Sequence, residues 1–396
     1  MSNILVINSG SASLKFQLID ATSEKTILKG KADKLGLPDA WVEFKYAGEN
    51  IKQNLKSATH TAALKNLFKF MDSRDLTPTI YAVGHRVAHG GELFADSTPI
   101  TDSVLAKIKS LIPLAPLHNP ANVLGIEAVQ KINPKLPQVA VFDTAFHATM
   151  PPEAYRYAVP EDWYKKHGVR RYGFHGTSYK FITQKTAEIL GKKPDKVNLI
   201  VAHIGSGASI SAIKNGQSIA NTMGFTPLAG LPMGTRSGNI DPSVIPFIMQ
   251  REGLTADEVL SILNRQSGHK ATAKVSDDMR DILLAAQAGN AQAALAYDIF
   301  VRKCAKYIGG FMTMLPRLDA LIFTAGIGEN GFETRQDIVQ RLEIFGFKLD
   351  QKTNRSTIVR DGREGLISAK TSKYQIYTLA TNEELMIARD TARIVS

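Results

Sequence analysis

Cysteine is almost absent from the sequence, because Cys304 is the only one among 396 residues. A single thiol excludes an intramolecular disulfide and a thiolate metal cluster. Its apolar surroundings indicate a buried core residue. We therefore expect no redox chemistry.

Long hydrophobic runs are absent as well. The apolar runs, such as residues 4–7 and 321–323, fall far short of the roughly 20 residues that span a bilayer. No basic segment with a longer apolar stretch precedes the first expected strand, so no secretory signal is expected. We expect a cytoplasmic protein with no membrane partner.

The sequence also lacks a concentrated basic segment. The net charge is +11, from 48 Lys+Arg against 37 Asp+Glu, but the basic residues are spread along the whole chain. A nucleic-acid module normally shows one basic face or arm. A small anionic substrate is therefore favoured, and no nucleic-acid partner is expected.

Apolar residues are abundant, at 44% of a chain of 396 residues. This length exceeds what one hydrophobic core usually serves, so two domains are predicted. Prolines near residues 148–152 mark the expected crossover. We predict one domain of residues 1–147 plus a C-terminal helix at 384–396, and a second domain of residues 148–383.

Strands and helices are expected to be mixed along the chain, which indicates an α/β fold. A polar cap at residues 381–384 precedes a final amphipathic helix, which is expected to pack on the first domain. Apolar residues recur at helical spacing in several other stretches. The expected helices are 103–112, 122–132, 178–190, 255–263 and 291–315.

Two hairpins of the same design lie in the two halves of the chain. The first has strands at 4–7 and 14–18 around a Gly/Ser turn at 8–13, and the second has strands at 199–203 and 210–213. Both tips contain Ser-Gly or Gly-Ser steps followed by Ala-Ser, which indicates an internal duplication. Such a tip brings backbone N–H groups close to a phosphate, although an ordinary hairpin turn is the alternative for either tip alone.

A third glycine turn lies at residues 323–331, after an apolar strand and before a helix. Its Gly-x-Gly-x-x-Gly spacing matches the dinucleotide-binding pattern, but no clear βαβ unit with a closing acidic residue follows. No Gly-x-x-x-x-Gly-Lys-Ser/Thr loop occurs either. We expect a nucleotide site at a helix N-terminus.

Four polar residues are candidates for chemistry on an anionic group. Arg86 and Arg236 stand in glycine-rich segments, where a planar guanidinium suits carboxylate or phosphate, with a surface ion pair as the alternative. His175 is flanked by glycines before an expected helix and is either a phosphoryl hydrogen-bond donor or a helix cap. Asp143 ends an apolar strand, a position typical of catalytic acids and also of turn caps.

With these segments assembled, the chain closely resembles the acetate kinase family. This family belongs to the superfamily that also holds sugar kinases, heat-shock chaperone ATPases and actin. The matching motifs occur in the family's order over nearly the whole length. They are VINSGSASLKFQL, GHRVAHGG, APLHNPAN, VFDTAFHATMPP, RRYGFHGTS, FTPLAGLPMGTRSGNIDP, FTAGIGEN and TNEELMIARDT.

The resemblance implies two duplicated ribonuclease-H-like (actin-like ATPase) domains around a central cleft, an N-terminal carboxylate-kinase domain and a nucleotide-binding domain, in a homodimer. It also implies reversible, direct in-line transfer of the ATP γ-phosphoryl group to acetate, giving acetyl phosphate and ADP in acetyl-CoA biosynthesis. Mg²⁺ is the implied ion, with Mn²⁺ as the alternative. An acetate nucleophile is already ionised at neutral pH, so no general base is needed.

The resemblance also assigns residues. It implies catalysis by Asp143, His175 and Arg236, with Asp143 aiding positioning or proton balance, and a metal site at Asn8 and Glu383. The implied acceptor site is Arg86, Ala88, Leu117, Phe174 and Pro227. The implied nucleotide site is Lys15, His203, Ile204, Gly205, Ser206, Gly207, Asp278, Met279, Arg280, Gly326, Ile327, Gly328, Glu329 and Asn330.

Four positions depart from the family pattern. Ser206 replaces an amide, residues 267–274 carry fewer glycines, and Met279 replaces a frequent Phe, so the preferred nucleotide stays open. Ala88 stands where valine often lines the methyl pocket, which favours propionate as a second acceptor. The alternatives are a propionate or butyrate kinase of the same fold, and a non-catalytic actin-like nucleotide-binding protein.

Overall fold

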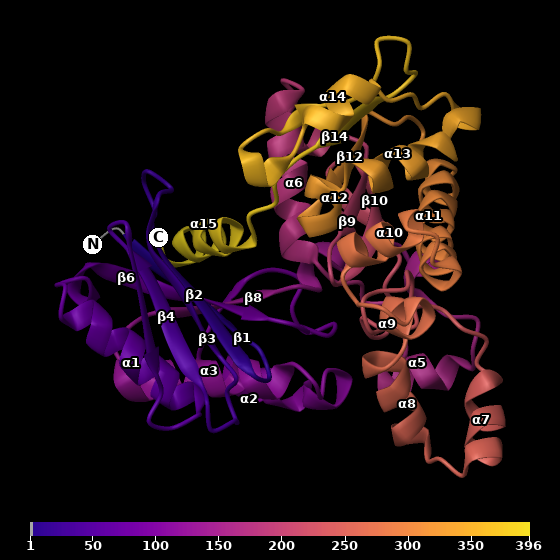
Figure 1. Cartoon of the computed structure of the whole chain (residues 1–396). Helices are drawn as coiled ribbons and strands as arrows, with labels where there is room; N and C mark the ends of the chain where they lie inside the picture. Colours follow the sequence, from indigo (N-terminus) through magenta and orange to yellow (C-terminus); the bar gives the residue numbers. More distant parts are fainter. Residues whose placement is uncertain (1–2) are drawn as a thin grey trace. The chain divides into compact units, whose positions relative to one another are not determined.

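The structure, a computed structural model, describes residues 3–396 (Figure 1). The chain divides into two units: unit 1 holds the described residues through Ala148 together with Asn382–Ser396, and unit 2 is Thr149–Thr381. These divisions lie one and two residues from the boundaries that we expected. Asn382 goes with unit 1 because its side chain caps the final helix by accepting from the Leu385 N–H group.

Unit 1 is built on a sheet of eight strands in the order β5-β4-β3-β2-β1-β6-β8-β7. β1 is antiparallel to β2 and parallel to β6, and β6 is parallel to β8. The strands are β1 (Asn3–Ser9), β2 (Ser13–Asp20), β3 (Thr26–Asp33), β4 (Trp41–Tyr46), β5 (Glu49–Asn54), β6 (Ile80–Val87), β7 (Thr98–Pro99) and β8 (Gln138–Phe142).

Unit 2 repeats this design in a six-stranded sheet, with the order β11-β10-β9-β12-β14-β13. β9 is antiparallel to β10 and parallel to β12, which is parallel to β14. The five strands β3-β2-β1-β6-β8 thus have counterparts in β11-β10-β9-β12-β14, which confirms the duplication. The strands are β9 (Leu199–Ile204), β10 (Ala208–Lys214), β11 (Gln217–Asn221), β12 (Ala320–Thr324), β13 (Gly365–Leu366) and β14 (Gln375–Thr378).

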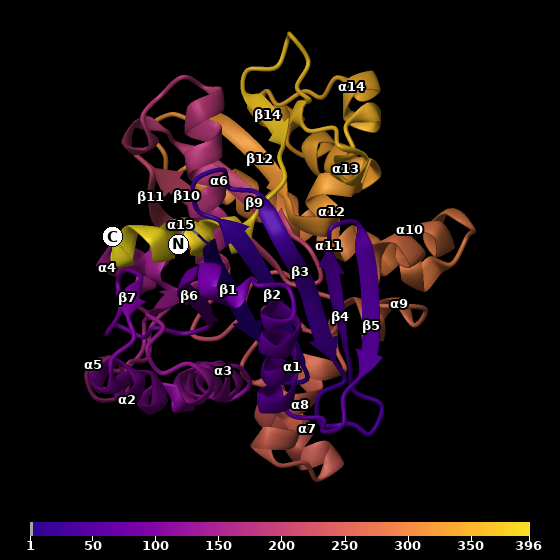
Figure 2. The same cartoon turned by 90° about the vertical axis from the view of Figure 1, so that its left-hand side faces the viewer.

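Helices cover the sheets of both units (Figures 1 and 2). Those of unit 1 are α1 (His60–Asp72), α2 (Asp102–Ser110), α3 (Asn119–Ile132) and α15 (Glu383–Val395). Those of unit 2 are α4 (Pro152–Tyr155), α5 (Glu161–His167), α6 (Gly176–Ile189), α7 (Val244–Glu252), α8 (Ala256–Arg265), α9 (Gly268–Ala273), α10 (Met279–Gln287), α11 (Ala291–Met312), α12 (Ala325–Asn330), α13 (Phe332–Gln340) and α14 (Gln351–Ser356). Short 3₁₀ turns lie at Thr77–Thr79, Ile112–Leu114, Ala145–Thr149, Pro194–Lys196, Glu343–Phe345 and Val359–Asp361.

Strand β1 is apolar on both sides because helices cover both faces of its sheet. Leu5 and Ile7 belong to a core that includes residues of α1 and α3. Ile4 and Val6 point the other way, into a core that includes Ile387 of α15. The expectation that the last helix packs on the first domain is therefore confirmed, and Figure 2 shows α15 and α1 on opposite sides of the sheet.

The core of unit 2 lies between its central strands and the long helix α11. Phe300, Val301, Cys304 and Ile308 of α11 pack in one cluster with apolar residues of β9, β10 and β12. Cys304 is fully buried, as expected, and burial raises the pKa of its thiol. Across residues 3–396, no helix is both long and apolar enough to cross a membrane.

Two expected turns have different structures. Asn8 and Ser9 belong to β1, since they pair with Lys15 and Leu14 of β2, so the first tip is only residues 10–12. The glycine turn expected at 323–331 is largely helix α12, and the Glu329 carboxylate accepts the N–H group of Ala325 at the start of this helix. Glycine spacing alone did not distinguish a turn from a short helix.

Gly84 of β6 is where α15 approaches the sheet most closely. A Cβ atom at Gly84 would lie 2.3 Å from Thr391 Oγ1 and 2.7 Å from Ile387 Cγ2. We expect Gly84→Ala to lower the free energy of unfolding by about 1 to 3 kcal/mol, because α15 must shift to make room. Gly310→Ala in α11 is the control, since a Cβ there meets nothing within 4 Å. Urea unfolding with an equal midpoint for wild type and Gly84→Ala would contradict this packing.

Candidate active site

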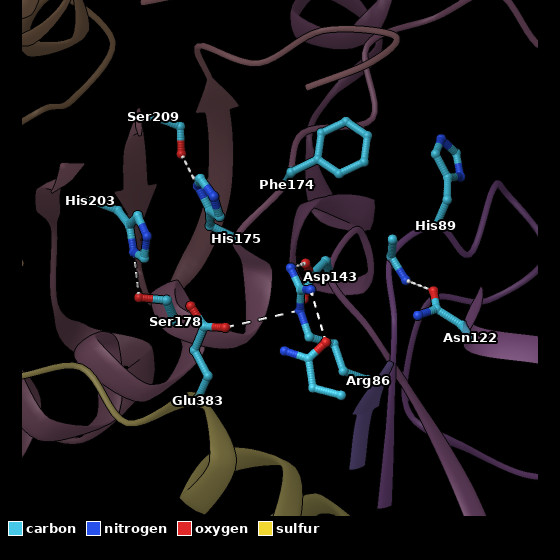
Figure 3. A network of polar contacts seen from close by, with 12 residues as sticks. Arg86, His89, Asn122, Asp143, Phe174, His175, Ser178, His203, Ser209 and Glu383 are labelled. Atoms are coloured by element: carbon cyan, nitrogen blue, oxygen red, sulfur yellow. Dashed lines mark hydrogen bonds and ion pairs between the residues drawn. The ribbon is translucent and has the colours of Figure 1, made fainter. Parts of the chain in front are cut away.

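Arg86 and Asp143 form an ion pair at the ends of two neighbouring parallel strands (Figure 3). Asp143 directly follows β8, whose Phe142 pairs with Val87 of β6, and the Asp143 N–H group donates to the Val87 carbonyl at 3.0 Å. Arg86 Nε donates to one carboxylate oxygen at 3.2 Å, and Nη2 donates to the other. The Asp143 side chain is only 3% exposed. Its carboxylate therefore holds one edge of the guanidinium in place.

Asn8 and Glu383 complete the group around this arginine. The parallel pairing of β1 and β6 reaches Ile7 and His85, so Asn8 and Arg86 come next in their strands. Arg86 Nη1 donates to Asn8 Oδ1 at 3.3 Å. Glu383, the first residue of α15, has its Oε2 atom 4.0 Å from Arg86 Nε. Three chain segments thus converge on one guanidinium within unit 1.

The charges of this group perturb one another. Burial alone would lower the pKa of Arg86, but the negative charges of Asp143 and Glu383 outweigh it, so the pKa is raised and the guanidinium stays protonated. Burial raises the pKa of Glu383 to about 7, because the attraction of Arg86 only partly offsets it and Asp143 adds repulsion. A nearby cation would therefore stabilise the ionised form of Glu383.

The residues around Arg86 fit a magnesium ion whose ligands are mostly water and phosphate oxygens rather than protein side chains. Among residues 3–396, no cluster of three or more His, Cys, Asp or Glu side chains has the arrangement of a metal site. Mg²⁺, however, usually takes only one or two carboxylates and completes its shell with water and phosphate oxygens. Glu383 and the Asn8 amide oxygen are hard oxygen donors of this kind, so the expected metal residues lie together in unit 1.

Two asparagines that we did not single out from the sequence fix the backbone after β6. Asn122 Oδ1 accepts the Ala88 N–H group at 3.0 Å, and Asn122 Nδ2 donates to the Ser9 carbonyl at 2.7 Å. Asn119 exchanges two hydrogen bonds with the backbone of His89. Both asparagines are buried in the first turn of α3. The signal in the sequence was their spacing of three residues around a helix-starting proline.

In unit 2, His175 stands at the N-cap of α6 with the unusual backbone angle φ 61°. Its Nδ1 atom lies 2.8 Å from Ser209 Oγ, and its ring stacks on that of His203 at a centroid distance of 4.1 Å (Figure 3). A Cβ atom on Gly207 would lie 3.3 Å from His175 Nε2. Because strained backbone often marks functional sites, we keep His175 as a candidate, with Nε2 facing the second hairpin tip.

The second hairpin tip, residues 205–207, lies beside the start of α12. A Cβ atom on Gly205 would lie 3.8 Å from the backbone nitrogen of Gly326. The Glu329 carboxylate accepts from the N–H groups of Ala325 and Thr381 at 2.9 and 3.0 Å. Hairpin tip and helix start therefore form one backbone surface, and the Glu329 side chain braces it rather than projecting from it.

Arg236 has no carboxylate partner in the part of the chain that the structure describes, and burial lowers its pKa. The only side-chain hydrogen bond of Arg236 there runs from Nη1 to Met233 Sδ at 3.6 Å. The backbone around it is held firmly, since residues 267–270 donate to the carbonyls of Met233, Gly234 and Thr235. A Cβ atom on Gly268 would lie 2.0 Å from the Met233 carbonyl oxygen. The segment that departs from the family pattern thus supports the arginine loop.

Some of the expected nucleotide residues have buried side chains, and others pair within unit 2. Ile204 is fully buried and Met279 is 3% exposed, both in the core of unit 2, so only their backbone is available to a ligand. Asp278 caps α10 and pairs with Arg280, which is 73% exposed. The Met279 change from the family pattern is therefore a core substitution. Asn330 contacts the backbone of Gly326 and Arg360 within its own unit.

The expected acceptor-pocket residues are distributed over both units. Ala88 is buried and Leu117 is 44% exposed in unit 1, whereas Phe174 is buried and Pro227 half-buried in unit 2. Lys15 is exposed on β2 opposite Asn8. Within unit 1, the structure therefore brings Asn8, Lys15, Arg86, Asp143 and Glu383 to the same end of the sheet. Within unit 2, it brings His175 and His203 to the hairpin tip at 205–207.

Two sheets that repeat one strand order, each opened by a hairpin, define the class of protein: a phosphotransferase with the duplicated actin-like fold. Two solved structures share this fold, each matching 100% of both chains. One is a propionate kinase from Francisella tularensis, with a TM-score of 0.95 and 43% identity. The other is the acetate kinase of Porphyromonas gingivalis, with a TM-score of 0.94 and 42% identity.

The sequence comparison identifies the family. A sequence model of the Acetokinase family matches residues 3–389, and the chain belongs to this family. The acetate kinase of Geobacillus sp. is 48% identical over 100% of both chains. That of Oceanobacillus iheyensis is 48% identical over 100% of this chain and 99% of its own.

The raised pKa of Glu383 predicts a pH dependence of stability. Between its ordinary value of 4.5 and about 7, the folded state binds the proton more tightly than the unfolded state, so this group's contribution to stability falls as pH rises through that window. We expect Glu383→Gln, without metal or nucleotide, to be more stable than wild type at pH 8 by about 1 to 3 kcal/mol. Urea unfolding should show this difference disappearing towards pH 5.

Glu24→Gln is the matched control. Glu24 pairs with Arg389 through a hydrogen bond that lowers its pKa, so this substitution should not stabilise the protein at pH 8. A stability difference for Glu383→Gln that is equal at pH 5 and pH 8 would contradict the assignment of a raised pKa.

Proposed function

We propose that the chain is an acetate kinase, which reversibly transfers the γ-phosphoryl group of ATP to acetate and gives acetyl phosphate and ADP. The observation that carries the proposal is a protonated guanidinium, Arg86, held by a buried carboxylate at the strand ends of unit 1. The full-length identity to acetate kinases supports the choice of acceptor. A polymerising or chaperone ATPase has no need for such an arginine.

Arg86 has donors to spare for the acceptor carboxylate. A guanidinium carries five N–H donors, and within the described chain three of them point to Asp143 and Asn8. The two others are available for acetate, which an arginine binds with defined orientation. An acetate ion needs no general base. Asp143 therefore acts by positioning Arg86, because both of its oxygens accept from that side chain.

Unit 2 supplies the groups for the nucleotide. The backbone N–H groups of the hairpin tip and of the start of α12 are suited to phosphate oxygens. Arg236, with no carboxylate partner in the described chain, neutralises charge on the transferring phosphoryl group, and His175 donates a hydrogen bond to it. Catalysis of phosphoryl transfer consists largely of positioning and charge stabilisation, and these groups are of the kinds that it needs.

Asn8 and Glu383 would hold the metal. When bound there, Mg²⁺ would supply positive charge beside the phosphate oxygens. Glu383 is suited to it because burial raises the pKa of its carboxyl group. Mn²⁺ is the alternative ion. On the family resemblance alone, we further propose a homodimer in the cytoplasm, without nucleic-acid or membrane partners.

The test is the initial rate of acyl-phosphate formation, trapped with hydroxylamine, with Mg-ATP and acetate, propionate or butyrate. We expect turnover that depends on Mg²⁺ and is highest with acetate. A rate with butyrate above the rate with acetate would contradict the assignment of acetate as the acceptor and would indicate a butyrate kinase. No turnover with any of the acids would leave the non-catalytic nucleotide-binding protein as the better account.

Propionate is a second candidate acceptor, favoured by Ala88. This residue is 6% exposed, its N–H group is fixed by Asn122, and it directly follows the strand that carries Arg86. Alanine has two methyl groups fewer than the valine that is frequent in the family, which leaves room beside the acceptor. The structurally similar protein of Francisella tularensis is a propionate kinase.

We expect Ala88→Val to lower kcat/KM for propionate more than for acetate, by roughly tenfold, because a methylene in an apolar pocket contributes about 1 to 3 kcal/mol. Specificity constants for both acids, measured at saturating Mg-ATP, give the ratio. If wild type and variant show the same ratio, Ala88 does not set the size of the acceptor.

A further inference from the structure

The tip of the first hairpin, Gly10 to Ala12, connects β1 and β2 next to the residues proposed for metal and acceptor. Ser11 is exposed, and its N–H group has no hydrogen-bond partner in the described chain. Because glycine adopts many backbone angles, the peptide that joins Gly10 to Ser11 is free to rotate unless something fixes it. The Gly10 N–H group donates to the Ser13 carbonyl at 2.8 Å across the turn, and two further hydrogen bonds hold the carbonyls of the tip.

His60 holds the first carbonyl of the tip. Its Nε2 atom lies 2.7 Å from the carbonyl oxygen of Gly10, although fifty residues separate the two in sequence. A carbonyl only accepts, so Nε2 carries the proton. The backbone N–H group of Leu35 donates to the Ala12 carbonyl at 2.9 Å. Both carbonyls are thus drawn towards the protein.

The direction of the Gly10 carbonyl sets the direction of an N–H group. A trans peptide plane carries its C=O and N–H groups on opposite sides, and no cis peptide occurs in residues 3–396. With the Gly10 carbonyl turned to His60, the Ser11 N–H group must point away from His60. If the peptide flipped, a carbonyl oxygen would replace that N–H group and would repel a phosphate.

We propose that His60 is a positioning residue for the nucleotide phosphates, because its hydrogen bond to Gly10 keeps the Ser11 N–H group turned outward as an anion donor. The inference rests on the proposed kinase function. His60 acts through the tip, since its ring nitrogen is committed to the carbonyl. It is therefore not a catalytic residue.

His60 is placed for this task by the start of helix α1. Thr59 caps the helix, and its side chain accepts the Ala62 N–H group at 3.1 Å. The preceding residue, Ala58, accepts from the N–H group of Gly36 at 2.7 Å, next to the Leu35 that holds Ala12. The loop after β3 and the start of α1 therefore form one support beneath the tip.

The experiment compares wild type with His60→Leu, which removes the donor, and His60→Gln, which keeps one. Thr59→Ala is the matched control, because it weakens the helix start but leaves the imidazole. We expect His60→Leu to raise KM for Mg-ATP about tenfold and KM for acetate less than about twofold, as for loss of one hydrogen bond. His60→Gln should restore most of the nucleotide affinity, and Thr59→Ala should remain close to wild type.

Calorimetric titration with Mg-ADP gives a second readout that needs no turnover. Weaker Mg-ADP binding by His60→Leu supports the proposal even if no acyl phosphate forms, in which case only the kinase assignment fails. Equal Mg-ADP affinities of wild type and His60→Leu overturn it, as does an equal loss of affinity in Thr59→Ala. If His60→Leu does not fold, His60→Asn, which is too short to reach Gly10, takes its place with the same expected result.

Discussion

The ion pair of Arg86 with the buried Asp143 is the interaction on which unit 1 depends. A buried carboxylate is costly unless it is paired, so the ends of β6 and β8 must stay side by side, and the sheet order keeps them there. β1 on the other side of β6 then brings Asn8 to the same guanidinium. The pair that neutralises Asp143 also orients the remaining donors of Arg86. The same contact that stabilises the fold would therefore prepare the proposed acceptor site.

Unit 2 has the same strand order, but the partners of its arginine differ from those of Arg86. Arg236 has no carboxylate partner within the described chain, and its loop is braced by hydrogen bonds to residues 263–270. A guanidinium without a carboxylate partner has its whole charge available to a phosphate, whereas the charge of Arg86 is partly neutralised by Asp143. The duplication therefore supplies two similar scaffolds, and from the difference in their polar partners we propose that one arginine binds a carboxylate and the other phosphates.

The sequence predicted features that follow from local patterns. These were the α/β duplication, both hairpins, Asp143 at a strand end and the docking of the last helix. It did not predict that Asn8 and Ser9 continue β1, because strand pairing with β2 decides this. It also missed the burial of Ile204 and Met279, and the roles of Asn122 and His60. The hydrogen bonds of Asn122 and His60 join residues that are 34 to 113 apart in sequence, and no local periodicity encodes contacts over such separations.

The most direct test of this account is the kinetics of Asp143→Asn, which keeps the shape of the side chain and removes its charge. Since Arg86 would lose its orienting partner, we predict that kcat/KM for acetate falls about a hundredfold or more, while KM for Mg-ATP changes less than about twofold and the variant remains folded by circular dichroism. A variant whose acetate turnover stays within about twofold of wild type would contradict the central claim that the charge of Asp143 positions Arg86 for the acceptor.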